Sequence, residues 1–310
     1  MLCKLRNWSF SMNSISAKAR SVISVYSQAK IKFFLNRRDP DLMTTYFEGG
    51  LGSQLMAYIE HHNKSKRFGS QALVDVSYFD SNEIYDNEWG LTHWIWKLDH
   101  YGIDLPITQK VESKLMSLRR PNDAERARFI LENNLLKVDK ELLLKLPVLS
   151  NAKRRNEIFF SKKDIASYGV IHVRKGDFLR VSSRLIEVEE LKSLLHDSKN
   201  MLPKIMIFIT DGLFSEYEKA QIRKVVGRKK FENYIFFDKA NEPVDETLVH
   251  DLMRCAKLLI TSNSTFSFTA GMLNVVPDSM ILFPITFYGE SSRYLNSIFR
   301  NKATFGVLER

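Results

Sequence analysis

The sequence predicts an α/β fold built on parallel, doubly wound sheets. Two observations predict it: short apolar runs alternate with helical patterns, and several of these runs end in polar residues. The alternation restarts more clearly in the second half of the 310-residue chain, which is long enough for about two domains. We therefore expect an arm at 1–43, a Rossmann-like domain at 44–160 and a second Rossmann-like domain at 161–310.

The first half begins with a strand, a glycine-rich turn and a helix. In chain order we expect a strand at 44–47, a turn at 49–52, a helix at 51–62, a strand within 71–78, helices within 108–147 and a basic, polar linker at 150–164. A strand, a glycine turn and a helix N-terminus together present backbone N–H groups to an anion.

The second half alternates strands and helices more regularly. We expect strands at 168–173, 204–210, 234–237, 258–261 and 280–283, the last of the chain, and helices at 187–199, 215–226, 244–257 and from Phe266 onward. Ligands of such sheets sit at the carboxyl ends of the strands. Polar clusters follow three of them, at 174–177, 210–211 and 263–267.

Two adjacent cations follow the first of these strands, in the run H-V-R-K-G-D at 172–177. A guanidinium grips two phosphate oxygens in its plane, and a neighbouring ammonium adds charge, so Arg174 and Lys175 fit a phosphate site. Asp177 is placed to orient Arg174 or to accept a proton from a hydroxyl. Two alternatives stay open: a surface turn held by an Arg–Asp ion pair, and a hydrogen-bonded core position for His172.

A second phosphate-suited cluster, N-S-T-F-S at 263–267, stands at an expected helix N-terminus. Such N-termini bind diphosphates through backbone N–H groups, but Ser or Thr there is also an ordinary N-cap. Together the two clusters predict a nucleotide diphosphate between the two halves. The glycine turn adds a weak signal, because it has neither the G-x-G-x-x-G spacing nor the lysine of a P-loop.

Three other motifs each have a simpler alternative. The aromatic run at 83–101 fits a platform for a sugar ring or ordinary core packing. The D-P-D run at 39–41 has the form of a metal site, but no apolar strand precedes it. His61 and His62 are expected on an exposed helix, without a further His or Cys at ligand spacing. We expect no metal and no cofactor.

The formal net charge of +10 points to an anionic partner. Eight basic and two acidic residues give the arm at 1–43 a net charge of +6, and apolar residues recur there at helical spacing. A basic amphipathic helix fits an anionic membrane surface; a surface helix or an untethered extension is the simpler alternative. We expect no nucleic-acid partner, because no zinc-finger spacing or RNP-like run accompanies the charge.

The number of cysteines and the hydropathy of the sequence indicate in which cellular compartment the protein is expected. Cys3 and Cys255 do not make a disulfide framework. The sequence has neither an apolar run long enough for a transmembrane helix nor a signal-peptide pattern. We expect a cytoplasmic protein, with the arm at 1–43 as a candidate peripheral contact to the inner face of a membrane.

Four runs resemble, in order and spacing, the α-1,2-fucosyltransferases of glycosyltransferase family 11. They are G-G-L-G-S-Q-L at 49–55, H-V-R-K-G-D-F at 172–178, T-D at 210–211 and N-S-T-F-S at 263–267. Each run alone is a modest signal, and the second and fourth together are specific. The resemblance covers roughly 44–290 and leaves the basic arm outside it.

The resemblance implies a GT-B-like fold, with two Rossmann-like domains facing a central cleft, and an inverting transfer that needs no metal. It implies that GDP-fucose, or a related GDP-deoxysugar, donates to a hydroxyl of an acceptor glycan or lipid-linked oligosaccharide. The product is then an α-1,2 linkage in bacterial surface polysaccharide synthesis. Donor binding is expected from Gly50, Gly52, Ser53, Gln54, His172, Arg174, Lys175, Asp211, Asn263, Ser264, Thr265 and Phe266. The expected catalytic residues are Arg174, on the diphosphate, and Asp177, as the base.

Three positions depart from the family pattern. Ser53 stands where Asn is usual, and Lys175 stands where a second Arg is frequent and loses the planar fork. Val249 stands where an acid that reads the guanine edge is expected, which leaves Glu246 or Asp251 as substitutes. A non-catalytic nucleotide- or glycan-binding protein is therefore the alternative function.

Overall fold

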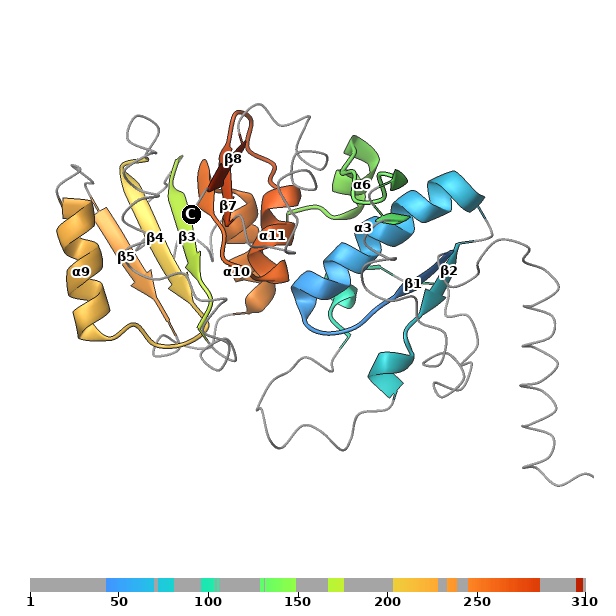
Figure 1. Ribbon diagram of the computed structural model, residues 1–310, viewed down its shortest axis with the longest axis horizontal. Coiled ribbons are helices and arrows are strands. Elements are labelled where there is room, and N and C mark those ends of the chain that lie inside the picture. The colour runs from blue at the N-terminus through green and yellow to red at the C-terminus, as the bar shows by residue number, and fades with distance from the viewer. Residues whose placement is uncertain are drawn as a thin grey trace, which may run out of the picture.

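The computed structural model describes residues 43–69, 72–80, 96–103, 105, 129–130, 132–148, 167–175, 203–227, 233–238, 245–284 and 305–308. Over these residues the chain is an α/β fold with a two-stranded and a six-stranded sheet, both parallel (Figure 1). The predicted α/β class with parallel strands is confirmed. The arm up to residue 42, the linker at 150–164 and the helix at 187–199 lie outside the described residues.

The smaller sheet is built from the first predicted strand, helix and strand. Its strands, β1 (Thr44–Tyr46) and β2 (Leu73–Asp75), pair in parallel, and α3 (Leu51–Phe68) connects them. A short 3-10 helix, η5 (Ser77–Asp80), follows β2. The helix continues past the predicted end at residue 62, and one side chain of this extension, Lys64, is buried.

The prediction that His61 and His62 lie on an exposed face of this helix is wrong. Both are buried, and the same stretch of α3 buries an ion pair, Lys64 Nζ to Glu60 Oε1 at 2.6 Å. Lys64 Nζ also donates to the Thr44 carbonyl of β1 at 2.9 Å. Charged side chains made this face look solvated in the sequence, whereas here they satisfy one another inside the protein. Burial lowers the pKa of His61 to about 4, so its ring is neutral at pH 7.

Two short helices complete the first part of the described chain. The 3-10 helix η6 covers Leu98–Tyr101, and α6 covers Lys140–Lys145, capped by Asp139, whose carboxylate accepts from the Leu142 N–H at 2.8 Å. Trp96, from the predicted aromatic run, packs with ring centroids 5.5 Å from both Phe47 and Phe79. Trp96 therefore belongs to the core. The part of that run at 83–95 lies outside the described residues.

The larger sheet has the strand order β5-β4-β3-β6-β7-β8. Its strands are β3 (Gly169–Val173), β4 (Ile205–Thr210), β5 (Asn233–Phe237), β6 (Leu258–Ile260), β7 (Met280–Pro284) and β8 (Phe305–Leu308). Counted from β3 this order is 3-2-1-4-5-6, which is the order of Rossmann-type sheets. The order reverses between β3 and β6. The carboxyl ends of these two strands therefore flank the position where such sheets bind ligands.

The prediction that the strand at 280–283 is the last of the chain is wrong. β8 pairs with β7 in parallel, Ile281 opposite Phe305 and Pro284 opposite Leu308. The run F-G-V-L is short and contains a glycine, which weakens a strand signal in sequence. Pairing with an existing strand edge compensates for this weak local preference.

Helices cover both faces of the larger sheet. On one face, Ile222 of α9 (Glu216–Gly227) clusters with Ile171 and Phe208. On the other, Leu252 of α10 (Glu246–Arg254) and Phe268 of α11 (Thr265–Met272) belong to a second cluster, which includes Val170. Alternate residues of β3 thus face opposite helix layers, as a doubly wound sheet requires.

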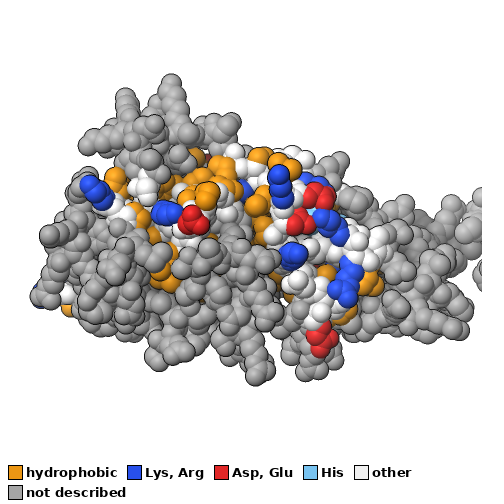
Figure 2. Space-filling view, turned by 90° about the horizontal axis from the view of Figure 1, so that it is seen from above, with side chains coloured by type: hydrophobic (Ala, Val, Ile, Leu, Met, Phe, Trp, Pro, Cys, Tyr) orange, Lys and Arg blue, Asp and Glu red, His pale blue; other side chains and the backbone are white. Residues whose placement is uncertain are grey.

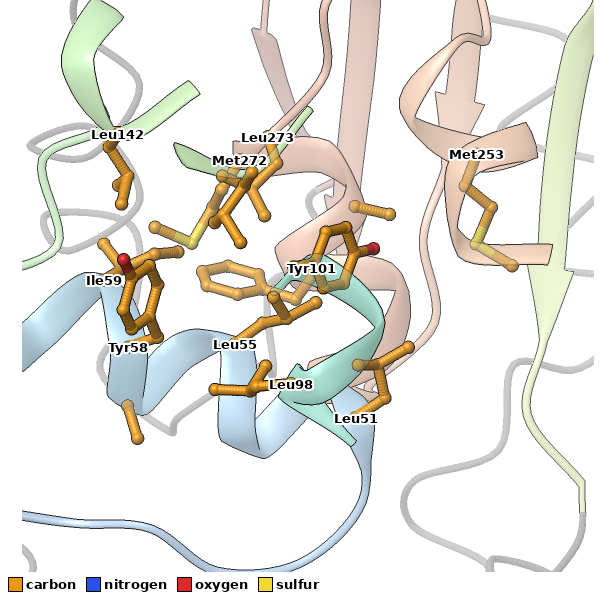
Figure 3. Close-up of a cluster of buried hydrophobic side chains, with 14 of the residues drawn as sticks. Leu51, Leu55, Tyr58, Ile59, Leu98, Tyr101, Leu142, Met253, Met272 and Leu273 are labelled. Atoms are coloured by element: carbon orange, nitrogen blue, oxygen red, sulfur yellow. The ribbon is translucent and has the colours of Figure 1, made fainter. Parts of the chain in front are cut away.

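One hydrophobic core joins α3 to the helices of the larger sheet (Figure 3). Leu51 and Leu55 of α3 lie with Leu98 and Tyr101 of η6 and with Met272 of α11. These side chains come from both halves of the sequence. The start of α3, and with it the glycine turn, is therefore fixed directly against the larger sheet's helices.

The described surface carries paired charges. Figure 2 shows Lys and Arg side chains interspersed with Asp and Glu on one face. Lys66 Nζ lies 2.6 Å from Glu141 Oε2, and Lys145 Nζ lies 3.0 Å from Glu141 Oε1. These lysines are neutralised locally. Among the helices that the structure describes, none combines the length and the apolar character needed to cross a lipid bilayer.

Candidate functional site

Arg174 and Lys175 leave the carboxyl end of β3, and Asp211 follows the neighbouring strand β4. The Asp211 carboxylate holds both residues. Its Oδ2 lies 2.8 Å from Arg174 Nη1, and its Oδ1 accepts a hydrogen bond from the Lys175 backbone N–H at 2.7 Å. Asp211 therefore orients Arg174, which is the role that the sequence suggested for Asp177. Asp177 lies outside the described residues.

The side chain of Lys175 takes a different direction from that of Arg174. Its ammonium donates to the Leu213 carbonyl at 2.8 Å and to Glu218 Oε1 at 2.5 Å, and it lies 5.0 Å from the centre of the Phe214 ring. The Lys175 charge is thus neutralised against the start of α9. Of the two adjacent cations, Arg174 is the one positioned at the strand ends.

His172 lies at the point where the strand order reverses, one residue before the end of β3. Its Nδ1 is 2.8 Å from the hydroxyl of Ser262, the second residue after β6, and its ring centroid is 5.9 Å from that of Phe266. Burial lowers the pKa of His172 to about 4, an effect that Asp211 opposes and Arg174 reinforces. The ring is neutral at pH 7 and links the Arg174 side of the site to α11.

Ser262 is the residue of this site that the sequence analysis missed. The predicted strand ran to residue 261 and the predicted cluster began at 263, so Ser262 fell between them. Its position immediately after a buried strand was the available signal, because the same rule selected its neighbours.

The helix α11 begins with an N-cap, which was the simpler interpretation of the N-S-T-F-S run. The hydroxyl of Ser264 accepts from the Phe266 N–H at 3.3 Å. The first turn of α11 has no acidic side chain, so nothing there neutralises the positive end of the helix dipole. Asn263 immediately precedes this cap. An N-cap and an anion site are compatible here, because one hydroxyl satisfies only one of the free N–H groups.

The glycine turn joins β1 to α3 in the way that the sequence predicts. Gly49 has a φ of 72°, a left-handed conformation that favours glycine. Gly50 is the N-cap of α3 and provides no side-chain cap. The Gln54 side chain donates to the Gly49 carbonyl at 2.8 Å and accepts from the Lys97 N–H at 2.8 Å. The Gln54 amide is therefore committed to the turn itself.

The first turns of α3 and α11 are in direct contact. Ser53 Oγ lies 3.2 Å from Thr265 Oγ1. A methyl group added to Gly52 would lie 2.5 Å from the Thr265 carbonyl carbon, and closer still to the backbone of Phe266. Neither helix has an acidic residue in its first turn. Two positive helix ends without an acid in their first turns therefore meet, and Phe266 of one of them lies beside His172. This arrangement favours an anion.

Replacing Gly52 with alanine is expected to lower the free energy of unfolding by about 1–3 kcal/mol, as overpacking of a close contact does. The atoms that obstruct the new methyl group belong to the backbone of Thr265 and Phe266, so a helix must move. At an open helix position the same change stabilises a protein by about 0.5–1 kcal/mol. Urea unfolding of the parent protein and of Gly52→Ala measures the sign of the change in unfolding free energy. A higher stability of Gly52→Ala would show that α3 and α11 do not touch.

Ser53→Ala is the matched control for this variant. It lies next in the same helical turn, removes the hydroxyl that faces Thr265 and adds no volume. We expect a loss of about 0.5–1.5 kcal/mol, that of one hydrogen bond. A larger loss for Gly52→Ala than for Ser53→Ala separates the steric contact from the hydrogen bond.

Glu246 and Asp251, the two acids that could recognise a guanine edge in place of Val249, differ in their exposure to solvent. Asp251 is buried and its Oδ1 is 3.1 Å from Arg254 Nη1. The half-exposed carboxylate of Glu246 forms an ion pair with the buried ammonium of Lys97. Of the two, Glu246 is the more accessible. Its ion pair connects Lys97, which precedes η6, to the start of α10.

One group of side chains within the described ranges has the spacing of a metal site: His62, Asp139 and Glu141. Lys66 Nζ lies 2.8 Å from Asp139 Oδ2 and 2.6 Å from Glu141 Oε2. The ammonium already supplies the positive charge that a metal ion would bring. We therefore interpret this group as an ion-pair network that reaches from buried His62 to the surface.

No family model, curated protein or solved structure matches the chain. The geometry itself joins most of the predicted site. Arg174 and Asp211 meet at the ends of β3 and β4, His172 reaches Ser262 and Phe266, and the first turn of α3 lies on the first turn of α11. Together these residues form a polar cluster at the reversal of strand order.

Proposed function

We propose that the chain is an inverting, metal-independent glycosyltransferase of GT-B architecture, which transfers fucose or a related 6-deoxyhexose from GDP to an acceptor glycan. The observation that carries the proposal is the meeting of three separate motifs in one cluster. The three motifs are far apart in sequence: the G-G-L-G-S-Q run at 49–54, the H-V-R-K run at 172–175 and the N-S-T-F-S run at 263–267. In the structure Phe266 of the third run lies against Gly52 of the first and His172 of the second, and Ser53 contacts Thr265. The same motifs carry the resemblance to family 11.

The chemistry of the cluster suits a leaving nucleoside diphosphate. As the glycosidic C1–O bond breaks, its electron pair stays on the diphosphate, and negative charge grows there. Arg174 and the free N–H groups of two helix N-termini would stabilise that charge from fixed positions. The Asp211 carboxylate, 2.8 Å from Arg174 Nη1, keeps the guanidinium oriented before the donor arrives.

The acceptor hydroxyl attacks C1 from the side opposite the diphosphate, so its oxygen forms the new bond while the old bond breaks. Inversion at C1 follows from this in-line geometry. The hydroxyl proton passes to a base, for which Asp177 remains the sequence-based candidate. The transferred sugar gains an acceptor oxygen and GDP leaves with the original one.

A donor screen tests the proposal. The full chain is incubated with GDP-fucose, and separately with GDP-colitose, together with a mixture of glycan acceptors, and mass spectrometry records products and released GDP. We expect a deoxyhexose added to an acceptor, or slow release of GDP by hydrolysis. Binding of GDP by calorimetry without turnover of either donor would favour the non-catalytic binding protein instead. Absence of both binding and turnover would overturn the proposal.

A further inference from the structure

A hydrogen bond between Ser262 and His172 connects the ends of β6 and β3 at the reversal point. Ser262 Oγ lies 2.8 Å from His172 Nδ1. Both residues are almost fully buried, Ser262 at 1% and His172 at 2% exposure. The bond joins the second residue after β6 to a residue of β3, so it connects the two strand ends that flank the candidate ligand position.

The lengths around Ser262 indicate which atom is the donor. Among the described residues, two neighbours can accept the proton of the Ser262 hydroxyl: His172 Nδ1 at 2.8 Å and Ser267 Oγ at 3.4 Å. Hydroxyl donors prefer separations of about 2.5–3.0 Å. If His172 Nδ1 carried the proton, the Ser262 hydroxyl would be left with the long contact to Ser267. The geometry therefore assigns the donor to Ser262 and leaves His172 Nδ1 unprotonated.

The charge state of the ring agrees with this assignment. Burial depresses the pKa of His172 to about 4; Asp211 from the end of β4 opposes that shift, and Arg174 from the end of β3 reinforces it. From α11 the ring faces Phe266, and from the segment between β6 and α11 it faces Ser262, which are both uncharged. A neutral imidazole carries one proton, which must then reside on Nε2.

We propose that Ser262 is a positioning residue that fixes His172 in the Nε2-protonated form, so that the ring offers an N–H donor to a phosphate oxygen of a nucleoside diphosphate. The identity of the ligand rests on the proposed function, whereas the state of the ring does not. In the opposite tautomer Nε2 would present a lone pair, which repels an anionic oxygen. One buried hydroxyl thus decides whether His172 attracts or repels the ligand.

The test reads the ring directly. The full chain is labelled with ¹⁵N-histidine, long-range ¹H–¹⁵N spectra report which ring nitrogen carries the proton, and the signal is assigned with His172→Gln. We expect Nε2 protonation in the parent protein at pH 7, a shift toward the other tautomer in Ser262→Ala, and its retention in Ser262→Thr, which keeps the hydroxyl. A parent ring protonated at Nδ1, or a tautomer unchanged in Ser262→Ala, would overturn the assignment.

Thr261→Val is the matched control. It removes a buried hydroxyl from the preceding residue, which donates to the Leu282 carbonyl at 3.3 Å and not to His172. The His172 signal should keep its tautomer in this variant. A change as large as that of Ser262→Ala would mean that any lost hydroxyl in this strand disturbs the ring, and the specific role of Ser262 would be refuted.

Calorimetry with GDP tests the ligand separately. We expect Ser262→Ala to bind GDP about tenfold more weakly than the parent, the effect of one lost hydrogen bond to a charged group. Equal affinity in the two proteins would overturn the role of the N–H donor. If the parent protein does not bind GDP but its His172 ring is protonated at Nε2, the proposed function is refuted. The conclusion that Ser262 fixes the tautomer of His172 is then retained.

Discussion

Alanine in place of Arg174 is expected to lower turnover of the sugar nucleotide about a thousandfold, the loss that follows removal of a fixed group on developing charge. The guanidinium lies at the carboxyl end of β3, 16% exposed and 2.8 Å from Asp211 Oδ2. It is therefore accessible to a ligand and already oriented. Release of GDP from GDP-fucose measures the rate, and circular dichroism verifies that the fold persists.

Two companion variants make this result specific. Arg174→Lys keeps the charge but loses the planar fork, so an intermediate rate is expected. Lys219→Ala removes the same charge from a lysine on α9, whose ammonium pairs with Glu216 at 3.0 Å, and should leave the rate unchanged. If Arg174→Ala keeps the parent rate, Arg174 does not act on the diphosphate and the proposed function loses its principal residue.

Truncation of Arg254 to alanine is expected to lower the free energy of unfolding by about 3–5 kcal/mol, the loss typical of one partner removed from a buried ion pair. Arg254 is fully buried at the end of α10. Its Nη2 donates to the Leu146 carbonyl at 2.5 Å, its Nε to the Leu273 carbonyl at 3.2 Å and its Nη1 to Asp251 Oδ1 at 3.1 Å. Nη1 also donates to the Pro147 carbonyl at 3.4 Å, so alanine would leave a buried carboxylate and three carbonyl groups without this donor.

Urea unfolding of the two proteins measures this difference. Arg67→Ala is the control, because its guanidinium also donates to a backbone carbonyl, that of Asn133 at 3.1 Å, but at the surface. The control should lose about 1 kcal/mol or less. A loss for Arg254→Ala no larger than that of the control would mean that water replaces the buried guanidinium.

The succession of strands along the chain from β3 to β7, and of the helices α9 to α11, could be predicted because local pattern determines it. Continuous apolar runs such as 205–210 are buried on both faces, and parallel strands of this kind alternate with helices. The burial of α3 could not be predicted in the same way. Its Lys64 and Glu60 neutralise each other inside the protein, and only the folded chain reveals which charges find such partners.

The candidate site also has a part that could be predicted from the sequence and a part that could not. The strand-end rule selected Arg174, Asp211 and the start of α11, because it depends only on where strands stop. The direction of a long side chain depends on its neighbours. The ammonium of Lys175 turns toward Glu218 of α9, a partner that no local sequence pattern identifies. Ser262 likewise belongs to the site through its hydrogen bond to His172 of the neighbouring strand.

The contact between the first turns of α3 and α11 has a consequence for the energetics of the free protein. Two helix dipoles meet there with like poles together, and neither first turn carries an acid to offset them. The contact thus bears an electrostatic cost that the side chains of these two first turns do not remove. An anion that settles between the two turns would relieve this cost, so ligand binding and folding stability are thermodynamically coupled at this place.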